Sequence, residues 1–577
     1  MEKWVVSAKK ADFQEIAEKF QIDKVTARLI RNRDIIGDEA IEEYLNGGWL
    51  HLHSPHQMKD CDRAVAILQV KIKEQKKIRI IGDYDIDGVN ASYILYQGLL
   101  RAGAVVDVEI PDRMKDGYGI NEKLIQEAAD EGVNTIITCD NGIAAVEQIA
   151  YARKLGMTVI ITDHHELQEV VPLAEAIVNP RQPDCPYPFK SLCGAAVAYK
   201  LVTCLYEAMG VPAAEAEAFI EFAAIATVGD VMDLVGENRI MVKEGLRLLT
   251  NTSNLGLKAL KEVNGLADSE ISAYHIGFVL GPCINASGRL DTAKKVLELL
   301  LSQSEEQAME LAVSLKALND ERKAMTLEGV AKAITIIETS NLSADKVLVV
   351  YLPECHESLA GIIAGRLREC YHKPAFVLTD AEQGVKGSGR SIEAYPMFTE
   401  LCKCSHLFTK YGGHAMAAGL SLPKDKVAVF REMINREAEL TEADFIPKII
   451  IDVPMPVDYI TESLIEELKI LEPFGMGNPK PVFAEKNLNI VSARILGKNK
   501  NVIKMQVSNE RKMRMEAIYF GDVEVFKDYI NHKFGESEVE KLFQSRENKV
   551  VLSATYYPTI NEYREMKTLQ IVIQNYQ

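Results

Sequence analysis

Four short segments of the 577-residue chain place acidic side chains or histidines where an apolar run ends. The first segment, GDYDIDG, contains Asp83, Asp85 and Asp87, and the second, TCDNG, contains Asp140. The third, ITDHHE, contains Asp163, His164 and His165, and the fourth, ATVGDVMDL, contains Asp230. Carboxylate oxygens mixed with imidazole nitrogens suit Mn²⁺ better than Ca²⁺, and Mg²⁺ also accepts the oxygen ligands. Together these residues could therefore bind divalent metal ions.

The stretch from Lys77 to Pro180 predicts the scaffold that would position these side chains. KIRIIGD, VVDVEIP, NTIITCD, MTVIITD and AIVNP are short β-branched runs, and helical patterns separate most of them. Such alternation predicts βαβ units and a mostly parallel sheet. Because parallel strands end at one edge of a sheet, three of the four segments should converge there.

Converging carboxylates repel one another, so their ionised forms need a cation. Two divalent ions about 3.5–4 Å apart, sharing a bridging carboxylate, would hold such a cluster. Each segment alone also has a structural explanation. The DxDxDG spacing resembles a calcium loop, but the twelfth position from Asp83 is Ile94 rather than Glu. Asp140 could cap a helix that begins near Ile143, and a histidine pair could be hydrogen-bonded core. Four such segments taken together favour the metal site.

The rest of the chain predicts further domains, as its length suggests. Residues 304–339 form one charged amphipathic pattern, which predicts a structural helix or, as we favour, a rigid connector between two lobes. A smaller α/β pattern follows it, and evenly spaced short strands after Phe445 predict a β-barrel. The expected domains are an N-terminal helical segment (1–65), a first α/β lobe (66–303), a connecting helix (304–342), a second lobe (343–445) and a barrel (446–577).

Composition is typical of a globular protein from a reducing compartment. The net charge of −17 argues against a general nucleic-acid coat protein but leaves room for a local basic groove. The ten cysteines include no CxxC pair, so their spacing predicts neither a zinc framework nor a disulfide scaffold. No segment predicts a signal peptide or a membrane span, and the expected location is the cytoplasm.

A local basic segment lies within the predicted barrel. Between Ser492 and Arg514 the only acid is Glu510. The cations of this segment are Arg494, Lys498, Lys500, Lys504, Arg511, Lys512 and Arg514. The segment could bind a nucleic-acid backbone or could be a solvated hairpin face, and the sequence leaves both open. Tyr519 and Phe520 could stack on bases, although one of them is expected in the core.

Longer motifs resemble the DHH phosphoesterase superfamily and, within it, the RecJ family of bacterial single-strand-specific exonucleases. The matching motifs cover nearly the whole chain and include IGDYDIDGVNAS, IPDRMKDGYGI, TCDNGI, ITDHHE, GPCINASGRL, KGSGRSI, GGHAMAAGL and LEPFGMGNPKPVF. The resemblance implies an α/β fold: a parallel-sheet DHH lobe and a smaller DHH-associated lobe, joined by a long helix, plus a C-terminal OB-fold that binds nucleic acid.

The resemblance also implies roles for single residues in the DHH lobe. The residues that match metal ligands are Asp85, Asp87, Asp140, His164 and Asp230, with Asp140 as the bridge. Asp83 matches a carboxylate close to the metals. His165 matches a histidine that positions or protonates the scissile phosphate. His165, Asp140 and Asp83 are therefore the expected catalytic residues.

Other matches concern the substrate. The residues that match the pocket for a 5′-terminal phosphate are Arg113, Tyr118, Ser388 and Arg390. Arg289 matches a contact to the nucleic-acid backbone, and His414 lies in the glycine-rich signature of the second lobe. Cys283 and Cys355 depart from the family pattern, which often has arginine and tryptophan there.

These observations predict a 5′-to-3′ exonuclease that degrades single-stranded DNA to 5′-mononucleotides with two Mn²⁺ ions, or Mg²⁺, in recombination and repair. One alternative is a DHH phosphodiesterase of short oligonucleotides or cyclic dinucleotides. Another alternative is a non-catalytic replication factor. Such a protein would be expected to lack some of the metal ligands. The expected partners are single-stranded DNA, a single-strand-binding protein and a RecQ-type helicase, with no membrane, and the expected state is a monomer.

Overall fold

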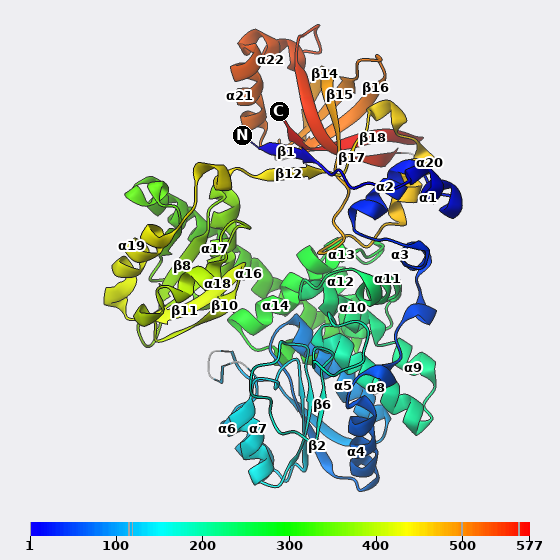
Figure 1. Ribbon diagram of the computed structural model, residues 1–577, viewed down its shortest axis with the longest axis vertical. Coiled ribbons are helices and arrows are strands. Elements are labelled where there is room, and N and C mark those ends of the chain that lie inside the picture. Colours follow the sequence, from blue (N-terminus) through cyan, green and yellow to red (C-terminus); the bar gives the residue numbers. More distant parts are fainter. Residues whose placement is uncertain (1, 114–115, 118, 498–499, 564–565) are drawn as a thin grey trace. The chain divides into compact units, whose positions relative to one another are not determined.

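The computed structural model describes residues 2–113, 116–117, 119–497, 500–563 and 566–577. They form two compact units, Leu52–Pro447 and the pair of segments Glu2–His51 and Lys448–Gln577 (Figure 1). The first unit contains both α/β lobes, and the second contains the barrel. The sequence did not predict that residues 2–51 belong with the barrel.

Five parallel strands form the sheet of the first lobe, in the order β3-β2-β4-β5-β6, as the sequence predicts. The strands are β2 (Lys77–Ile81), β3 (Val105–Glu109), β4 (Thr135–Cys139), β5 (Thr158–Thr162) and β6 (Ala176–Val178). The helices packed around this sheet include α4 (Cys61–Lys73), α5 (Ile86–Arg101), α6 (Glu122–Asp130), α7 (Val146–Lys154) and α8 (Gly194–Met209). β2, β4 and β5 are almost wholly buried, as expected for a parallel sheet covered on both faces.

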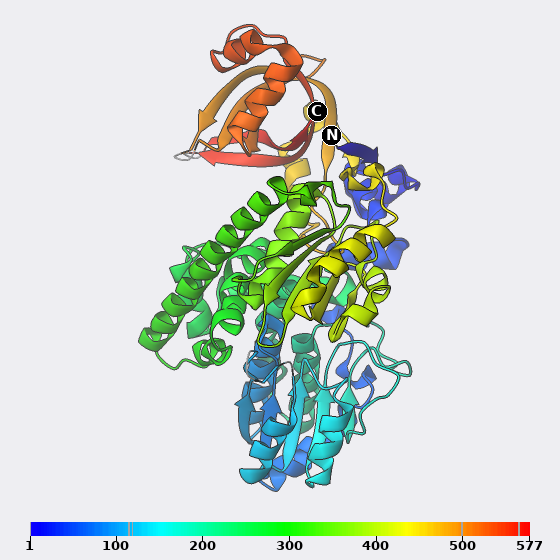
Figure 2. The ribbon, with the colours of Figure 1, turned by 90° about the vertical axis from the view of Figure 1, so that its left-hand side faces the viewer.

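Helices follow the sheet, and one of them reaches the second lobe. They include α10 (Ile220–Gly229), α12 (Leu255–Val263), α14 (Gly281–Leu290) and α16 (Glu305–Glu338). α16, a long green helix in Figure 2, begins at Ser304, whose hydroxyl accepts a hydrogen bond from the Gln307 N–H. Its first half packs on α12 and α14, and Ala333 and Ile337 near its end belong to the core of the second lobe. The predicted connecting helix is confirmed.

The second lobe has a mixed five-stranded sheet in the order β10-β11-β9-β8-β7. Its strands are β7 (Leu348–Tyr351), β8 (Ala375–Asp380), β9 (Val385–Arg390), β10 (Lys410–His414) and β11 (Ala417–Leu422). Only β7 and β8 are parallel, and the other neighbouring strands are antiparallel. The helices α17 (Ala360–Tyr371) and α19 (Val427–Glu437) belong to two separate hydrophobic cores, which take alternate residues of β7 and β8.

The second unit is built on a closed barrel, which confirms the predicted OB-fold. Its strands are β14 (Phe483–Leu496), β15 (Val502–Ser508), β16 (Arg514–Phe520), β17 (Val551–Tyr563) and β18 (Met566–Tyr576). They follow the order β14-β15-β16-β18-β17, and pairing of β14 with β17 closes the barrel. β1 (Lys3–Val6) pairs in parallel with β12 (Lys448–Ile451). Leu29 and Ile30 of α2 (Lys24–Asn32) join the barrel core, which explains why the N-terminal segment belongs to this unit.

Among the described residues, no helix combines the length and the apolar composition needed to cross a lipid bilayer.

Candidate active site

The loop after β2 brings three aspartates to the carboxyl edge of the parallel sheet. Asp85 is the N-cap of α5, and its side chain accepts hydrogen bonds from the N–H groups of Asp87 (2.9 Å) and Gly88 (3.0 Å). The Asp87 carboxylate accepts two more, from the N–H groups of Gly194 (2.6 Å) and Ala195 (2.7 Å) at the start of α8. A helix N-terminus favours a negative charge, so α8 holds the Asp87 carboxylate in a fixed orientation.

Asp140 follows β4 in the left-handed backbone region, with a φ of 60°. Such conformations are uncommon for residues other than glycine and concentrate at functional sites. A β-carbon at Gly194 would lie 2.7 Å from the Asp140 β-carbon, so only glycine lets α8 approach this loop. The N-cap of α7 is Ala145, which excludes a capping role for Asp140 at this helix.

Asp163 orients the two histidines that follow β5. Its Oδ1 accepts hydrogen bonds from the His164 N–H (2.7 Å) and from His165 Nδ1 (2.7 Å), and its Oδ2 accepts one from the Ile143 N–H (2.9 Å). Burial alone would raise the pKa of Asp163, but the hydrogen bond with His165 contributes to a net lowering. Burial would lower the pKa of His165, but this hydrogen bond helps to raise it to about 9. The two side chains therefore form an aspartate–imidazolium pair at neutral pH.

The side chains from these loops converge, as the sequence predicts. His164 Nε2 lies 3.0 Å from Asp140 Oδ1, 3.5 Å from Asp87 Oδ2 and 3.9 Å from Oδ2 of Asp230, the C-cap of α10. The ligand atoms of three sets lie within 4.8 Å of one another: Asp87, His164 and Asp230; Asp83, Asp85 and Asp140; and Asp140, His164 and His165. Asp140 and His164 each belong to two of these sets, so they link the acids into one group.

Burial and mutual repulsion raise the pKa values of several acids in this group. Burial and the neighbouring Asp85 raise the pKa of Asp83 to about 8. Burial and Asp87 raise the pKa of Asp230 to about 8, and that of Asp140 well above its usual range. Burial lowers the pKa of His164, which favours the neutral imidazole that a metal ion requires.

The residues present fit a divalent cation. Asp83 Oδ1 is buried and has no hydrogen-bond partner among the described residues. A buried polar atom left without a partner costs about 1–3 kcal/mol, which a bound cation would offset. Several carboxylates with one neutral imidazole form a donor set that matches Mn²⁺, and the oxygens alone match Mg²⁺.

Four arginines from separate elements lie near one another beside the acids. Burial and the guanidinium groups of Arg113, Arg322 and Arg390 lower the pKa of Arg289 to about 10. The Arg113 guanidinium lies 5.2 Å from the ring centre of Tyr84, which is between Asp83 and Asp85 in the chain. No described carboxylate forms an ion pair with Arg289, Arg322 or Arg390. Cations gathered in this way favour an anionic ligand. Arg322 was not predicted, because an arginine within a long helix gives no local signal.

A pocket of about 360 Å³ adjoins the sheet of the second lobe. The residues lining it include Ser388 of β9, Lys410 of β10 and, from the first lobe, Arg113. Arg390 lies two residues after Ser388, and its Nη2 is 2.9 Å from the position of a β-carbon added to Gly361 of α17. The guanidinium therefore lies close to the α17 backbone, and a side chain at position 361 would require it to move. Cationic and hydroxyl side chains in one pocket suit a phosphate group.

The other predicted residues have different positions. His414 is exposed at the end of β10, and the described residues that line the pocket include neither His414 nor Arg390. Tyr118 lies outside the described residues. Cys283 is buried in α14, where the Asn319 amide lies 3.4 Å from its sulfur, so this departure from the family pattern is in the interior. Cys355 is partly buried against the core of the second lobe.

The basic segment of the barrel is partly neutralised. Lys504 pairs with Glu516 at 2.9 Å and Arg511 with Asp458 at 2.6 Å, while Lys498 lies outside the described residues. Tyr519 packs on Phe526 and Tyr576, with ring centres 5.9 and 5.3 Å away. Phe520 is 62% exposed, so of the two aromatic residues only Phe520 could stack on a base.

Models of three protein families match separate parts of the chain. They are the DHH family N-terminal domain at residues 77–227, the DHHA1 domain at 344–440 and the RecJ OB domain at 451–575. The three matches fall on the first lobe, the second lobe and the barrel unit.

Two bacterial proteins are similar over most of the chain. The single-stranded-DNA-specific exonuclease RecJ of Bacillus subtilis is 37% identical over 86% of this chain, which covers 63% of that relative and thus less than two thirds of its length. The protein of the same name from Escherichia coli is 31% identical, and the match covers 96% of both chains.

Solved structures show the same similarity. The structure of RecJ in complex with Mn²⁺ from Thermus thermophilus matches with a TM-score of 0.83 and 25% identity, covering all of this chain and 79% of that one. A structure of exonuclease RecJ bound to manganese matches with a TM-score of 0.59 and 31% identity, covering 67% of this chain and 96% of that one. Sequence, domain order and fold agree, and the chain belongs to the RecJ family of single-stranded-DNA-specific exonucleases.

Proposed function

We propose that this chain is a 5′-to-3′ exonuclease that hydrolyses single-stranded DNA to 5′-mononucleotides with two Mn²⁺ ions, which Mg²⁺ could replace. The observation that carries the proposal is the position of His164 Nε2, within 3.0–3.9 Å of carboxylates from three separate elements. The names of the relatives and the Mn²⁺ and Mg²⁺ in two related structures support the same activity and ions.

The proposed metal ligands are Asp85, Asp87, Asp140, His164 and Asp230. Asp140 is the proposed bridge because its carboxylate belongs to two of the three ligand sets, and Asp83 lies beside them. When bound, a pair of divalent ions supplies a hydroxide nucleophile near neutral pH and stabilises the leaving oxygen. The chain contributes fixed orientations: α8 holds Asp87, and the left-handed turn holds Asp140.

His165 is the proposed contact to the scissile phosphate. Its hydrogen bond to Asp163 keeps the imidazole protonated and sets the direction of the ring. An imidazolium in this position stabilises the charge that develops on the phosphate oxygens and can donate a proton to the leaving group. Asp163 acts through His165 and is therefore a positioning residue.

Cationic side chains from the two lobes are proposed to make hydrolysis begin at the 5′ end of the DNA. Arg113, Ser388 and Arg390, together with Tyr118, are proposed to bind the 5′-terminal phosphate. Arg289 is proposed to contact the strand backbone, and Arg322 adds positive charge beside it. Exposed His414 is proposed to bind substrate further from this pocket. The barrel is proposed to bind single-stranded DNA through Arg494 and Phe520.

The proposed setting is recombination and repair in the cytoplasm, as a monomer, with a single-strand-binding protein and a RecQ-type helicase as partners. The ten cysteines are all free thiols, which is consistent with a reducing compartment.

Digestion of end-labelled DNA with Mn²⁺ tests the activity. A single strand labelled at its 5′ end should release labelled mononucleotide from the first turnovers, and a blunt duplex should stay intact. His164→Ala, purified in parallel, controls for a contaminating nuclease. Activity confined to di- and trinucleotides or cyclic dinucleotides would instead support the phosphodiesterase alternative, and inactivity on every substrate would support a non-catalytic factor.

A further inference from the structure

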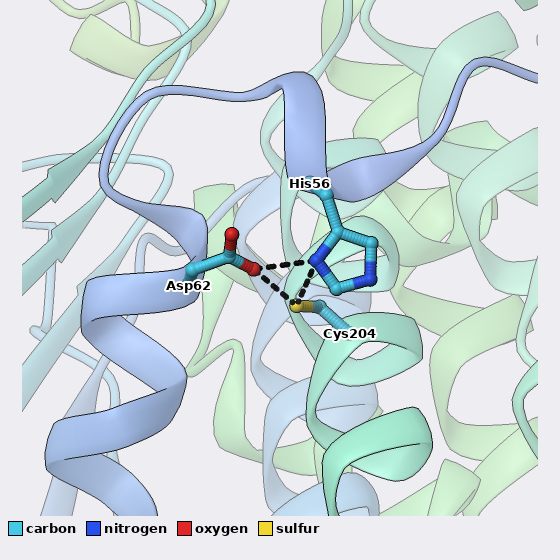
Figure 3. Close-up of side chains that lie close together, drawn as sticks. All are labelled: His56, Asp62 and Cys204. Atoms are coloured by element: carbon cyan, nitrogen blue, oxygen red, sulfur yellow. Dashed lines mark hydrogen bonds and ion pairs between the residues drawn. The ribbon is translucent and has the colours of Figure 1, made fainter.

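A second cluster of metal-competent side chains lies in the first lobe, apart from the strand-end acids. His56, Asp62 and Cys204 point toward one another from η2 (Pro55–Gln57), α4 and α8 (Figure 3). Cys204 is ten residues after Gly194 on α8, or about 15 Å along the helix from the Asp87 and Asp140 contacts. The function proposed above does not use this cluster.

The distances within the cluster are close to those of a tetrahedral zinc site. Cys204 Sγ lies 3.4 Å from Asp62 Oδ1 and 3.6 Å from His56 Nδ1. Zinc bonds of about 2.0–2.1 Å to nitrogen or oxygen and about 2.3 Å to sulfur separate such donors by roughly 3.3–3.6 Å. His56 Nδ1 and Asp62 Oδ1 are 2.5 Å apart, so an ion between them requires a movement of less than about 1 Å.

The surroundings of His56 resemble the outer contacts of a metal-bound histidine. Its other ring nitrogen, Nε2, lies 2.8 Å from Glu207 Oε2, one turn beyond Cys204 on α8. A carboxylate on the far nitrogen is the usual partner of a histidine that binds zinc, because it fixes the ring and increases its basicity. Cys61, buried next to Asp62, hydrogen-bonds to Cys204, and this bond together with burial raises the pKa of Cys61. A second sulfur is therefore close to the first.

The ion-free cluster is held together differently. Hydrogen bonds to Glu207 and Asp62 raise the pKa of His56 to about 9, so the ring carries a proton between two carboxylates. A metal ion at Nδ1 takes the place of that proton, and the Glu207 contact is preserved.

We propose that His56, Asp62 and Cys204 bind one structural Zn²⁺ ion, with water or Cys61 as the fourth ligand. One thiolate, one imidazole and one carboxylate form a donor set suited to zinc, whereas the oxygen-rich strand-end group suits Mn²⁺ or Mg²⁺. The ion would join η2 and α4 to α8, and α8 also holds Asp87. Cysteine spacing did not predict this site, because His56 and Asp62 are far from Cys204 in the chain.

Titration of the full-length protein with Co²⁺, in the presence of Mn²⁺, tests the proposal. Co²⁺ bound to a thiolate produces a charge-transfer band in the near ultraviolet, and the proposed ligands of the strand-end group include no thiolate. The band should saturate at one Co²⁺ per chain and disappear when one equivalent of Zn²⁺ is added. Cys204→Ser should abolish it, and Cys402→Ser, which alters an exposed thiol of the second lobe, should leave it unchanged.

If Cys204→Ser does not fold, variants of the more exposed residues of the cluster can test the proposal in its place. His56→Gln, at a half-exposed side chain, should also abolish the band. Glu207→Gln should retain it but weaken Zn²⁺ binding about tenfold to a hundredfold. Zn²⁺ should raise the Tm of the wild-type protein and not that of His56→Gln. The absence of a band in the wild type, or an unchanged band in both Cys204→Ser and His56→Gln, would overturn the proposal.

Discussion

The two lobes of the first unit each have a five-stranded sheet, but the two sheets gather opposite charges. The first sheet is wholly parallel, and aspartates follow β2 and β4 at the edge where its strands end. The second sheet is mostly antiparallel, and its glycine-containing strands β9 and β10 carry Lys386, Arg390 and Lys410.

The difference shows how topology selects the ligand. Parallel strands bring the ends of separate βα units to one place, so carboxylates far apart in the chain meet and need a cation. Antiparallel strands that contain glycine leave space beside the backbone, where cationic side chains can hold an anion. A nuclease that acts from a phosphorylated end needs both, a metal site for hydrolysis and a phosphate pocket for positioning.

The largest expected effect is the loss of a proposed metal ligand in the parallel-sheet lobe. His164→Ala should lower kcat by at least about a thousandfold, which is the upper range for one lost electrostatic contact to a transition state. The protein should stay folded because the change removes a buried group whose Nδ1 has no hydrogen-bond partner among the residues that the structure describes. Initial rates on single-stranded DNA and the far-ultraviolet circular dichroism spectrum measure the two outcomes. Full activity in this variant would show that His164 is not needed for hydrolysis and would contradict a metal site in this lobe.

A smaller effect is expected where a residue acts through its neighbour. Asp163→Asn should lower kcat about tenfold to a hundredfold, since the His165 ring loses its charged partner. The affinity for Mn²⁺ should change less than in His164→Ala, and the pH–rate profile should shift to lower pH as the pKa of His165 falls. An unaltered profile would show that Asp163 has only a structural role.

Changes in the second lobe should alter the choice of substrate end and leave the metal ions in place. Arg390→Ala should reduce the preference for a 5′-phosphate over a 5′-hydroxyl about tenfold to a hundredfold, because a hydrogen bond to a charged group contributes about 1.5–3 kcal/mol. Competition between the two kinds of end measures this ratio. Arg436→Ala on α19 is the matched control, since this exposed arginine of the same lobe pairs with Glu437. An equal loss of the 5′-phosphate preference in both variants would show that Arg390 does not bind the terminal phosphate.

The smallest effect concerns the stability of the metal-free protein. Burial raises the pKa of Asp83 and Asp230 to about 8 from the usual value of 3.8. Because these folded-state values exceed the unfolded ones, the stability they contribute is full below about pH 4 and is lost as the pH rises toward 8. With a chelator present, Tm should therefore fall between about pH 4 and about pH 8, and Mn²⁺ should restore it. In Asp230→Asn the Tm of the metal-free protein should fall less steeply with pH. An identical dependence of Tm on pH in the variant and the wild type would contradict the raised pKa of Asp230.

Local patterns in the sequence predict much of this arrangement, and the remainder depends on distant packing. The β-branched runs before Asp83, Asp140 and Asp163 predict the parallel sheet and the convergence of its acids, although their role as ligands remains a prediction. Arg322 could not be found in this way, since its place beside Arg289 depends on how α16 packs between the lobes. Pairing of β1 with β12 joins two segments that are far apart in the chain, and no local periodicity encodes such a contact.

The central claim, that the strand-end acids and His164 bind two ions, is tested most directly by electron paramagnetic resonance of the protein titrated with Mn²⁺. We expect two Mn²⁺ per chain with the spin-coupled spectrum of ions about 3.5–4 Å apart, and its loss in Asp140→Asn. Isolated, uncoupled Mn²⁺ at saturation, or a coupled pair that survives in Asp140→Asn, would contradict it.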